Sequence, residues 1–500
     1  MTKINELEKE FLQFVKKMDQ YREAISLMNW DMRTGAPRKG IEQRSETIGL
    51  LSTEVFQLST SEQMEEYINE LERAELSEMT QKTVLECKKE FERNKKIPEA
   101  EYKEYVILQA KSEAKWEEAK EAADFQSFLP YLEKIVSMTK RFVDYWGYDG
   151  HPYNRLLDDY EPGMTVNTLD RVFGQLREQL VPIVQQVNES SAKPRTDFLF
   201  QEFPIEKQRA FSQTILKQLG YDFEAGRLDE TVHPFAITIN RNDVRVTTKY
   251  DEKDFRTAIF GTIHECGHAI YEQNISADLI GTPLCDGTSM GIHESQSLFF
   301  ENFIGRNRSF WQYHYDQLKN YSTGQFDDVS VDEFYRAVNV AGPSLIRIEA
   351  DELTYPLHII VRYELEKAIF SNEIAVKDLP GIWNEKMEDY LGVRPSHDGE
   401  GVLQDVHWAA GLFGYFPSYA LGYIYAAQFK ATMDKSIANF DELLARGEIE
   451  PIRTWLTENI HQYGKLKSPA EIIRDVTGEN INPAYLVQYL RQKYGEIYQF

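Results

Sequence analysis

The chain has 500 residues, 42% of them hydrophobic, which is enough to build the core of one large domain or of several smaller ones. Its 56 Lys and Arg residues against 81 Asp and Glu residues give a formal net charge of −25, which argues against nucleic acid as a partner. No stretch has the character of a secretory signal or a membrane span, and Cys87, Cys266 and Cys285 form no paired framework. We therefore expect a cytoplasmic protein that contacts no membrane.

The N-terminal region predicts a lobe of amphipathic helices over residues 1–192. Apolar residues recur there at helical spacing, as at Val84, Cys87 and Phe91, between strongly charged faces. Four prolines are expected to divide the region into separate helices: Pro37, Pro98, Pro130 and Pro152. A polar cluster at residues 188–194 marks the boundary with a second lobe over residues 193–500, and we expect the two lobes to form one continuous domain.

Two β-rich runs come next along the chain. Residues 235–239 and 244–248 are joined by a turn-forming segment at residues 240–243. This pattern predicts a hairpin with an edge to which a peptide can add as a strand, and it places Arg245 in the edge strand. Helical patterns then resume and continue to the C-terminus.

The pentapeptide His264-Glu265-Cys266-Gly267-His268 directly follows the hairpin. Asp254 is a helix cap ahead of it, and apolar residues from Phe255 onward recur at helical spacing. Because an α-helix turns by about 100° per residue, both imidazoles and the carboxylate share one face. This is the spacing of a zinc-hydrolase site, in which His264 and His268 bind the metal and Glu265 handles protons. Cys266 points away from both histidines, so we expect a small helix residue there rather than a ligand.

A catalytic zinc ion normally takes three protein ligands, so one ligand is still missing. The helix continues through Tyr271 and Asn274 without the glycine and third histidine of the metzincin pattern. The next candidates lie on a second helix that opens at His293. Glu294 is the favoured third ligand, and His293 and Glu301 remain the alternatives.

With its other short motifs, the chain resembles the carboxypeptidase Taq family of metallocarboxypeptidases over nearly its whole length. The N-terminal segment with Trp30, Asp31, Thr34 and Pro37 is similar to that of the family. Six further motifs occur in the family order: His233-Pro234-Phe235, residues 243–247, the HEXXH motif at 264–268, residues 293–296, residues 346–351 and residues 401–408.

The resemblance implies a mainly α, large helical metallopeptidase fold with a small β-sheet and a deep active-site groove roofed by the N-terminal helices. It assigns the metal to His264, His268 and Glu294 and the general base to Glu265. It further implies Zn²⁺, or Co²⁺ in its place, a homodimer, and removal of C-terminal residues from peptide substrates with broad tolerance and proline disfavoured.

The oxyanion of the reaction needs hydrogen-bond donors, and His407, Trp408 and three tyrosines cluster in one stretch that can supply them. Because related helical metallopeptidases use a histidine and a tyrosine, we expect His407 and Tyr423 in this role. Asp351 is a candidate acceptor for a ligand histidine.

A carboxypeptidase also needs a cation for the terminal carboxylate of its substrate, and Arg245 and Arg347 are both candidates. Further substrate-site or scaffolding residues are expected at His233, Tyr419, Gln404 and Asp405.

Two other functions fit part of the pattern. One is a metallo-oligopeptidase that cuts internal bonds of short peptides, because it shares the helical groove and the glutamate ligand. The other is a helical scaffold protein with a structural metal, which would need no general base.

Overall fold

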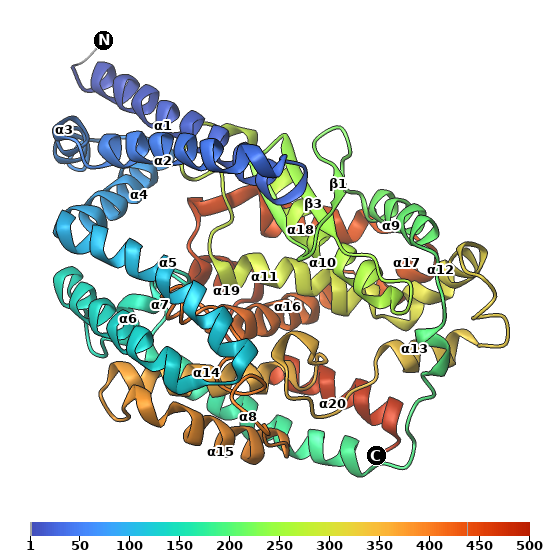
Figure 1. Cartoon of the computed structure of the whole chain (residues 1–500). Helices are drawn as coiled ribbons and strands as arrows, with labels where there is room; N and C mark the ends of the chain where they lie inside the picture. The colour runs from blue at the N-terminus through green and yellow to red at the C-terminus, as the bar shows by residue number, and fades with distance from the viewer. Residues whose placement is uncertain (1–2, 438) are drawn as a thin grey trace.

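The computed structural model describes residues 3–437 and 439–500 and is mainly helical with one small sheet, as predicted (Figure 1). The N-terminal half contains α1 Lys3–Thr34, α2 Ile41–Ser59, α3 Glu62–Leu71, α4 Glu78–Lys95, α5 Glu99–Ala122, α6 Phe125–Trp146, α7 Tyr153–Leu157, α8 Val166–Glu189, α9 Ile205–Leu219, β1 Leu228–Glu230, β2 Ala236–Asn240 and β3 Asp243–Thr248. The rest contains α10 Phe255–Gln273, α11 Met290–Leu298, a π-helix Phe299–Gly305, α12 Arg308–Tyr321, α13 Val331–Val338, α14 Tyr355–Phe370, α15 Leu379–Leu391, α16 Pro417–Ser436, α17 Phe440–Ala445, α18 Glu450–Asn459, α19 Pro469–Thr477 and α20 Ala484–Tyr498. Among the described residues, no helix is both long and apolar enough to cross a membrane.

Three of the four predicted proline boundaries are confirmed, and one is wrong. Pro37 lies just after α1, Pro98 directly precedes α5 and Pro152 directly precedes α7. Pro130 instead lies inside α6. The helix tolerates it because the proline is close to the N-terminus, where few backbone hydrogen bonds are lost, and because a long apolar face from Phe125 to Val143 is buried.

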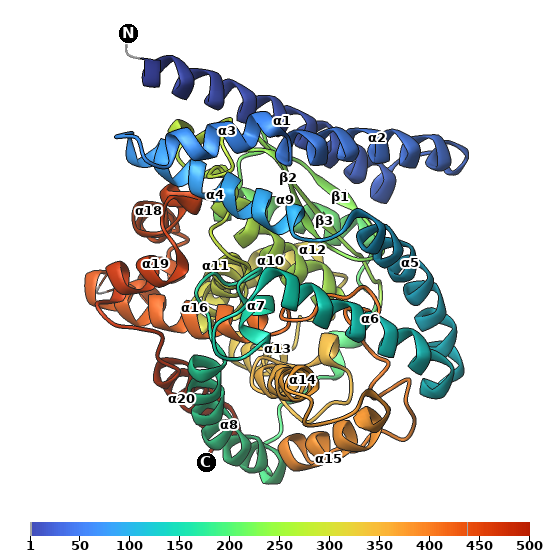
Figure 2. The same ribbon diagram turned by 90° about the vertical axis from the view of Figure 1, so that its left-hand side faces the viewer.

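The apolar side chains form two separate cores. A small core joins α1, α2, α3 and α4, from Phe11 to Phe91, and a much larger core begins at Tyr105 and continues to the C-terminal helix. In Figure 2, α1, α2 and α3 lie across one side of the molecule above the sheet. The cores therefore divide well before residue 192, and α8 packs against α14 and α20 of the larger body. The division into lobes at residue 192 stays a prediction.

The predicted hairpin is confirmed, but its strands have different positions from those expected. β2 and β3 pair antiparallel, and the three-residue strand β1 adds to β3 in parallel, which gives the order β1-β3-β2. Arg245 is therefore in the central strand and not, as predicted, at the edge. The prediction failed because β1 is too short to show a periodic signal in the sequence. The open edge belongs to β2.

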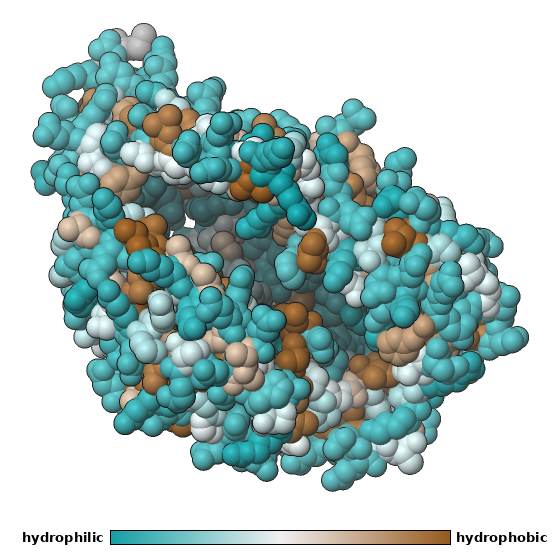
Figure 3. All heavy atoms as spheres, viewed as in Figure 1, coloured by the Kyte–Doolittle hydropathy of each residue, from teal (hydrophilic) through white to brown (hydrophobic). Residues whose placement is uncertain are grey.

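A groove of about 1380 Å³ lies along this edge. Residues of β2, α1 and α4 line it, and His268 and His293 lie in its wall. In Figure 3 this side of the molecule is hollowed below the N-terminal helices. The N-terminal helices thus form one side of the groove, as expected from the resemblance.

α10 and α11 approach each other unusually closely. A Cβ atom at Gly267 would lie 2.4 Å from the carbonyl oxygen of Gln296 and 2.6 Å from the Cα of Ser297, so only glycine fits between the two backbones. On the other side of α11, a Cβ atom at Gly422 of α16 would lie 2.6 Å from the Cβ of Glu294. The two glycines allow Glu294 to be held between α10 and α16.

Substitution of Gly267 tests this packing, and Gly261 of the same helix is a matched control because a Cβ atom there meets nothing within 4 Å. Gly267→Ala must push the helices apart, so we expect the free energy of unfolding of the metal-free protein to fall by ~1–3 kcal/mol. Gly261→Ala should raise it by ~0.4–1 kcal/mol, because alanine restricts the unfolded chain. Denaturant titration measures both values, and equal stabilisation by the two substitutions would contradict the close contact.

Candidate active site

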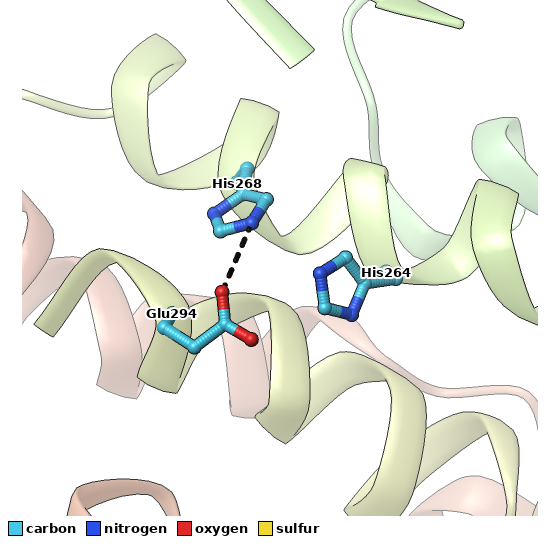
Figure 4. Close-up of side chains that lie close together, drawn as sticks. All are labelled: His264, His268 and Glu294. Carbon is cyan, nitrogen blue, oxygen red and sulfur yellow. Dashed lines mark ion pairs between the residues drawn. The ribbon is translucent and has the colours of Figure 1, made fainter. Parts of the chain in front are cut away.

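The structure brings His264, His268 and Glu294 together. One potential ligand atom from each lies within 4.8 Å of the others. The two imidazoles project from successive turns of α10, and the carboxylate reaches them from α11, with Glu294 Oε2 at 3.7 Å from His268 Nε2 (Figure 4). Two imidazole nitrogens and one carboxylate oxygen are a donor set that zinc prefers at catalytic sites. The residues therefore fit a metal ion.

A carboxylate orients the first of the two histidines. His264 Nδ1 donates to Glu301 Oε2 at 3.0 Å, and the other oxygen of Glu301 accepts from Arg306 at 2.9 Å. The bond to Glu301 leaves His264 Nε2 for the metal. Glu301 itself is thus a partner of a ligand, which excludes it as the third ligand.

A second histidine orients the other ligand. His268 Nδ1 and His293 Nδ1 share a hydrogen bond of 2.6 Å, and His293 Nε2 bonds Glu272 Oε1 at 2.9 Å. Both nitrogens of His293 are therefore engaged, and His293 is not a ligand. Of the three candidates for the third ligand, Glu294 alone faces the two histidines.

The electrostatics of this place favour a cation. Burial opposes protonation of His264, yet the hydrogen bond that it donates to Glu301 and the charges of Glu294 and Glu265 raise its pKa to about 10. Burial and the neighbouring His293 and His264 lower the pKa of His268 well below its usual range. One positive charge is stabilised among three carboxylates, and a bound dication would supply that charge.

Glu265 lies beside the metal residues and the open edge of the sheet. Its side chain is buried, and burial raises its pKa to about 7, although the charge of His264 and a hydrogen bond from the Ala236 backbone act in the opposite direction. Ala236 is the first residue of β2. A proton-accepting group therefore lies next to the edge where an extended peptide can pair.

Cys266 is buried in the main core, where burial raises the pKa of its thiol. It is a packing residue, as expected, because a neutral thiol on that side of the helix does not face the metal residues.

A cluster of two arginines lies near Glu294. Arg347 and Arg362 share the single carboxylate of Asp405, with N–O distances of 2.8 and 2.6 Å. Arg347 also donates to the hydroxyl of Tyr355 at 3.0 Å, and its charge acts on Glu294. The two guanidinium groups exceed the one carboxylate by one positive charge, which an anionic ligand would compensate.

His407 and Tyr419 lie next to this cluster. His407 Nε2 is 3.4 Å from the hydroxyl of Tyr419, and the ring of Tyr419 lies 5.2 Å from the guanidinium of Arg347. Burial and the charge of Arg347 lower the pKa of His407 to about 4, so the imidazole is neutral. Among the described residues, Nδ1 of His407 is buried and has no hydrogen-bond partner, so its hydrogen-bonding capacity is unused.

The prediction for Tyr423 is wrong in its placement. The hydroxyl of Tyr423 donates to Glu352 at 2.7 Å inside a buried polar cluster with Tyr489, Tyr494 and Lys493. Burial raises the pKa of Tyr415 and of Tyr419, and the nearby charge of Glu294 acts in the same direction on both. They replace Tyr423 as candidates near the metal residues.

The side chain of Arg245 is engaged by a carboxylate and by an aromatic ring. It forms an ion pair of 2.6 Å with Asp243, and its guanidinium lies 5.4 Å from the ring of Trp30 on α1. These contacts attach the N-terminal helix to the sheet. The structure thus gives Arg245 a structural ion pair, and it shows no contact of Arg245 with the metal residues among the interactions of the described chain.

The remaining predicted residues lie in three different places. Gln404 accepts from the backbone of Arg347 at 2.9 Å and from Arg362 at 2.7 Å, so Gln404 and Asp405 hold the arginines in place. His233 lies exposed in the loop between β1 and β2. Asp351 accepts from Thr354 and from the Gly342 backbone, so it caps a turn and is not the acceptor of a ligand histidine.

Three contributors were missed from the sequence: Glu272, Tyr355 and the pairing of Glu301 with His264. Glu272 is four residues after His268 on the same helix, a spacing that could have indicated it. Nothing local indicated Tyr355 or the role of Glu301, because both depend on contacts between distant segments.

A helix with an HEXXH pattern, a glutamate from a second helix and an adjacent edge strand define the class of metallopeptidases with a glutamate ligand. The model of the carboxypeptidase Taq (M32) metallopeptidase family matches residues 10–494. The chain belongs to this family, and it is a metal-dependent carboxypeptidase.

Individual relatives are similar to this chain over nearly their whole length. Carboxypeptidase 1 of Bacillus subtilis is 61% identical over 497 residues, covering 99% of each chain. Thermostable carboxypeptidase 1 of Thermus thermophilus is 40% identical over 500 residues, covering 97% of this chain and 98% of the relative. The crystal structure of the M32 carboxypeptidase from Deinococcus radiodurans is similar with a TM-score of 0.96 at 35% identity, covering 99% of this chain and 100% of that one.

The role of Glu301 is tested by Glu301→Gln. The amide has nearly the same shape but cannot offer His264 a charged acceptor, so we expect metal affinity to fall ~10- to 100-fold. Competition with a chromophoric chelator measures the affinity. Cys266→Ala is the matched control on the same helix and should leave the metal content unchanged. Loss of metal in the cysteine variant, or full affinity in the glutamine variant, would contradict the assignment.

Proposed function

We propose that this chain is a zinc-dependent carboxypeptidase that removes residues one at a time from the C-terminus of peptides. The observation that carries the proposal is the combination of the metal triad and Glu265 with the surplus positive charge at Arg347, whose charge acts on the ligand Glu294. The carboxylates around the two histidines favour a bound cation, and the surplus positive charge at Arg347 favours a bound anion. A peptide whose scissile carbonyl faces the metal can place its terminal carboxylate near Arg347.

Zinc is the metal that the donor set favours, and cobalt can replace it with the same ligands. His264 and His268 would bind it through Nε2, because Nδ1 of each is already engaged, and Glu294 would complete the set. When bound, the ion acts as a Lewis acid on the scissile carbonyl and on the attacking water.

Glu265 is the proposed general base. A carboxylate whose pKa is near 7 can take a proton from water and return it to the leaving amine at neutral pH. The adjacent edge of β2 supports an extended substrate, because its free backbone groups can pair with the peptide. The chain thus binds and orients the substrate with the sheet edge and moves the proton with Glu265.

Arg347 is the proposed anchor for the terminal carboxylate. Asp405 remains paired with Arg362 when Arg347 turns to a substrate, so the rearrangement strands no buried carboxylate. The unpartnered nitrogen of His407, with Tyr415 or Tyr419, offers neutral donors for the developing oxyanion.

Finer properties belong to the same proposal and rest on the family likeness and the composition. They are broad tolerance of C-terminal side chains, poor cleavage beside proline, a homodimer, a cytoplasmic location, peptides as the binding partners and no association with nucleic acid or membranes. An oligopeptidase that cuts internal bonds would have no use for the surplus charge at Arg347.

Replacing Glu265 separates catalysis from metal binding. In Glu265→Gln the shape of the side chain is kept but the proton acceptor is lost, so we expect kcat to fall ~10²–10⁴-fold while the zinc content is unchanged. Metal analysis and peptide hydrolysis are measured on the same preparation. Retained activity at unchanged zinc content would contradict the general-base role of Glu265.

The end of the substrate that is recognised is tested with one peptide in two forms, a free acid and a C-terminal amide. The free acid should be shortened from its C-terminus and the amide should be a poor substrate. Arg347→Ala should lower kcat/KM for the free acid ~30- to 1,000-fold, which corresponds to about 2–4 kcal/mol, and should abolish the discrimination.

Arg245→Ala is the matched control, because it removes an arginine that is paired away from the metal residues. It should leave the ratio of the two rates unchanged. Equal cleavage of acid and amide by the unmodified enzyme would contradict recognition of the terminal carboxylate. Loss of discrimination in the Arg245 variant alone would show that Arg245, and not Arg347, binds this carboxylate.

A further inference from the structure

The two metal-binding histidines have different partners at Nδ1. His264 is bonded to a carboxylate, that of Glu301. His268 is bonded to another imidazole, that of His293, and the carboxylate of Glu272 comes only after it. Ligand histidines usually bond a carboxylate, a backbone carbonyl or water, so the imidazole partner of His268 needs an explanation.

The hydrogen bonds of this second set can run in only one direction when a metal is bound. A metal on Nε2 of His268 leaves the ring proton on Nδ1, so Nδ1 donates and His293 Nδ1 must accept. His293 then carries its own proton on Nε2 and donates it to Glu272 Oε1, 2.9 Å away. The carboxylate of Glu272 thus determines which ring nitrogen carries the proton in His293, and through it in His268.

His293 is held tightly in this orientation. A Cβ atom at Gly287 would lie 2.5 Å from Cδ2 of His293, so the loop before α11 closes directly on the ring. The Gly287 backbone N–H also donates to Glu272 Oε1 at 3.0 Å. On the other side the ring of Tyr271 lies 5.4 Å away, and its hydroxyl accepts from the Thr288 backbone. The glycine, the tyrosine and the glutamate leave the imidazole little freedom to turn.

We propose that His293 is a positioning residue that orients His268 toward the metal through its Nδ1 atom, while Glu272 and Gly287 hold His293 itself in place. This inference rests on the proposed metal site. It gives the histidine that precedes Glu294 a role of its own: one segment of α11 supplies a ligand to the metal and the orienting partner of another ligand.

Two substitutions of His293 distinguish orientation from space filling. In His293→Asn the side-chain oxygen occupies the place of Nδ1 and can accept from His268, but the bond to Glu272 is lost. In His293→Gln the side chain reaches Glu272 and is closer in size to histidine, but the acceptor for His268 is lost.

The readouts are zinc affinity by chelator competition, the visible spectrum of the cobalt-loaded protein, and thermal unfolding of the metal-free protein as a control for folding. We expect His293→Gln to lose affinity ~10- to 100-fold and to alter the cobalt spectrum, with His293→Asn closer to the unmodified protein in both. A space-filling role predicts the opposite order.

Each outcome is decisive. Equal affinities in both variants, or a better glutamine variant, overturn the inference about His293. Failure of the unmodified protein to bind zinc or cobalt would instead overturn the proposed metal site, so the two failures can be told apart.

Discussion

The backbone contact between α10 and α11 at Gly267 sets the geometry on which the rest of the site depends. Any side chain at this position would hold the helices apart, and the carboxylate of Glu294 would then no longer reach the histidines. Gly422 repeats the arrangement on the far side, where α16 passes Glu294 at close range. Because the contact at Gly267 is with backbone atoms of α11, the spacing of the two helices that carry the ligands is set by rigid elements.

Charge is also distributed unequally around the site. Around the two histidines, Glu265, Glu294 and Glu301 favour a cation, and the surplus positive charge of Arg347 and Arg362 over Asp405 favours an anion nearby. Arg306 and Glu272 hold the outermost partners in place. A site with this distribution of charge can distinguish the end of a peptide from its middle by electrostatics.

Local patterns in the sequence predicted most of the helices and the hairpin, and they favoured Glu294 over two alternatives as the third ligand candidate. The helical spacing of His264 and His268, the cap at Asp254 and the hairpin all depend on residues close in the chain, and the structure has them. Tyr423 was misplaced because α16 is buried on nearly every side, so spacing along it does not reveal the face toward the cleft. Arg245 was misplaced because a three-residue strand covers the other side of β3, and the π-helix after α11 follows from packing that no local pattern encodes.

The central claim is that His264, His268 and Glu294 bind one ion and that His293 and Glu301 do not touch it. A crystal structure of the zinc-loaded enzyme, with anomalous differences collected at the zinc edge, tests this most directly. We expect a single peak about 2.0–2.2 Å from Nε2 of both histidines and from a carboxylate oxygen of Glu294. A peak coordinated by His293 or Glu301, or no peak between α10 and α11, would contradict the account.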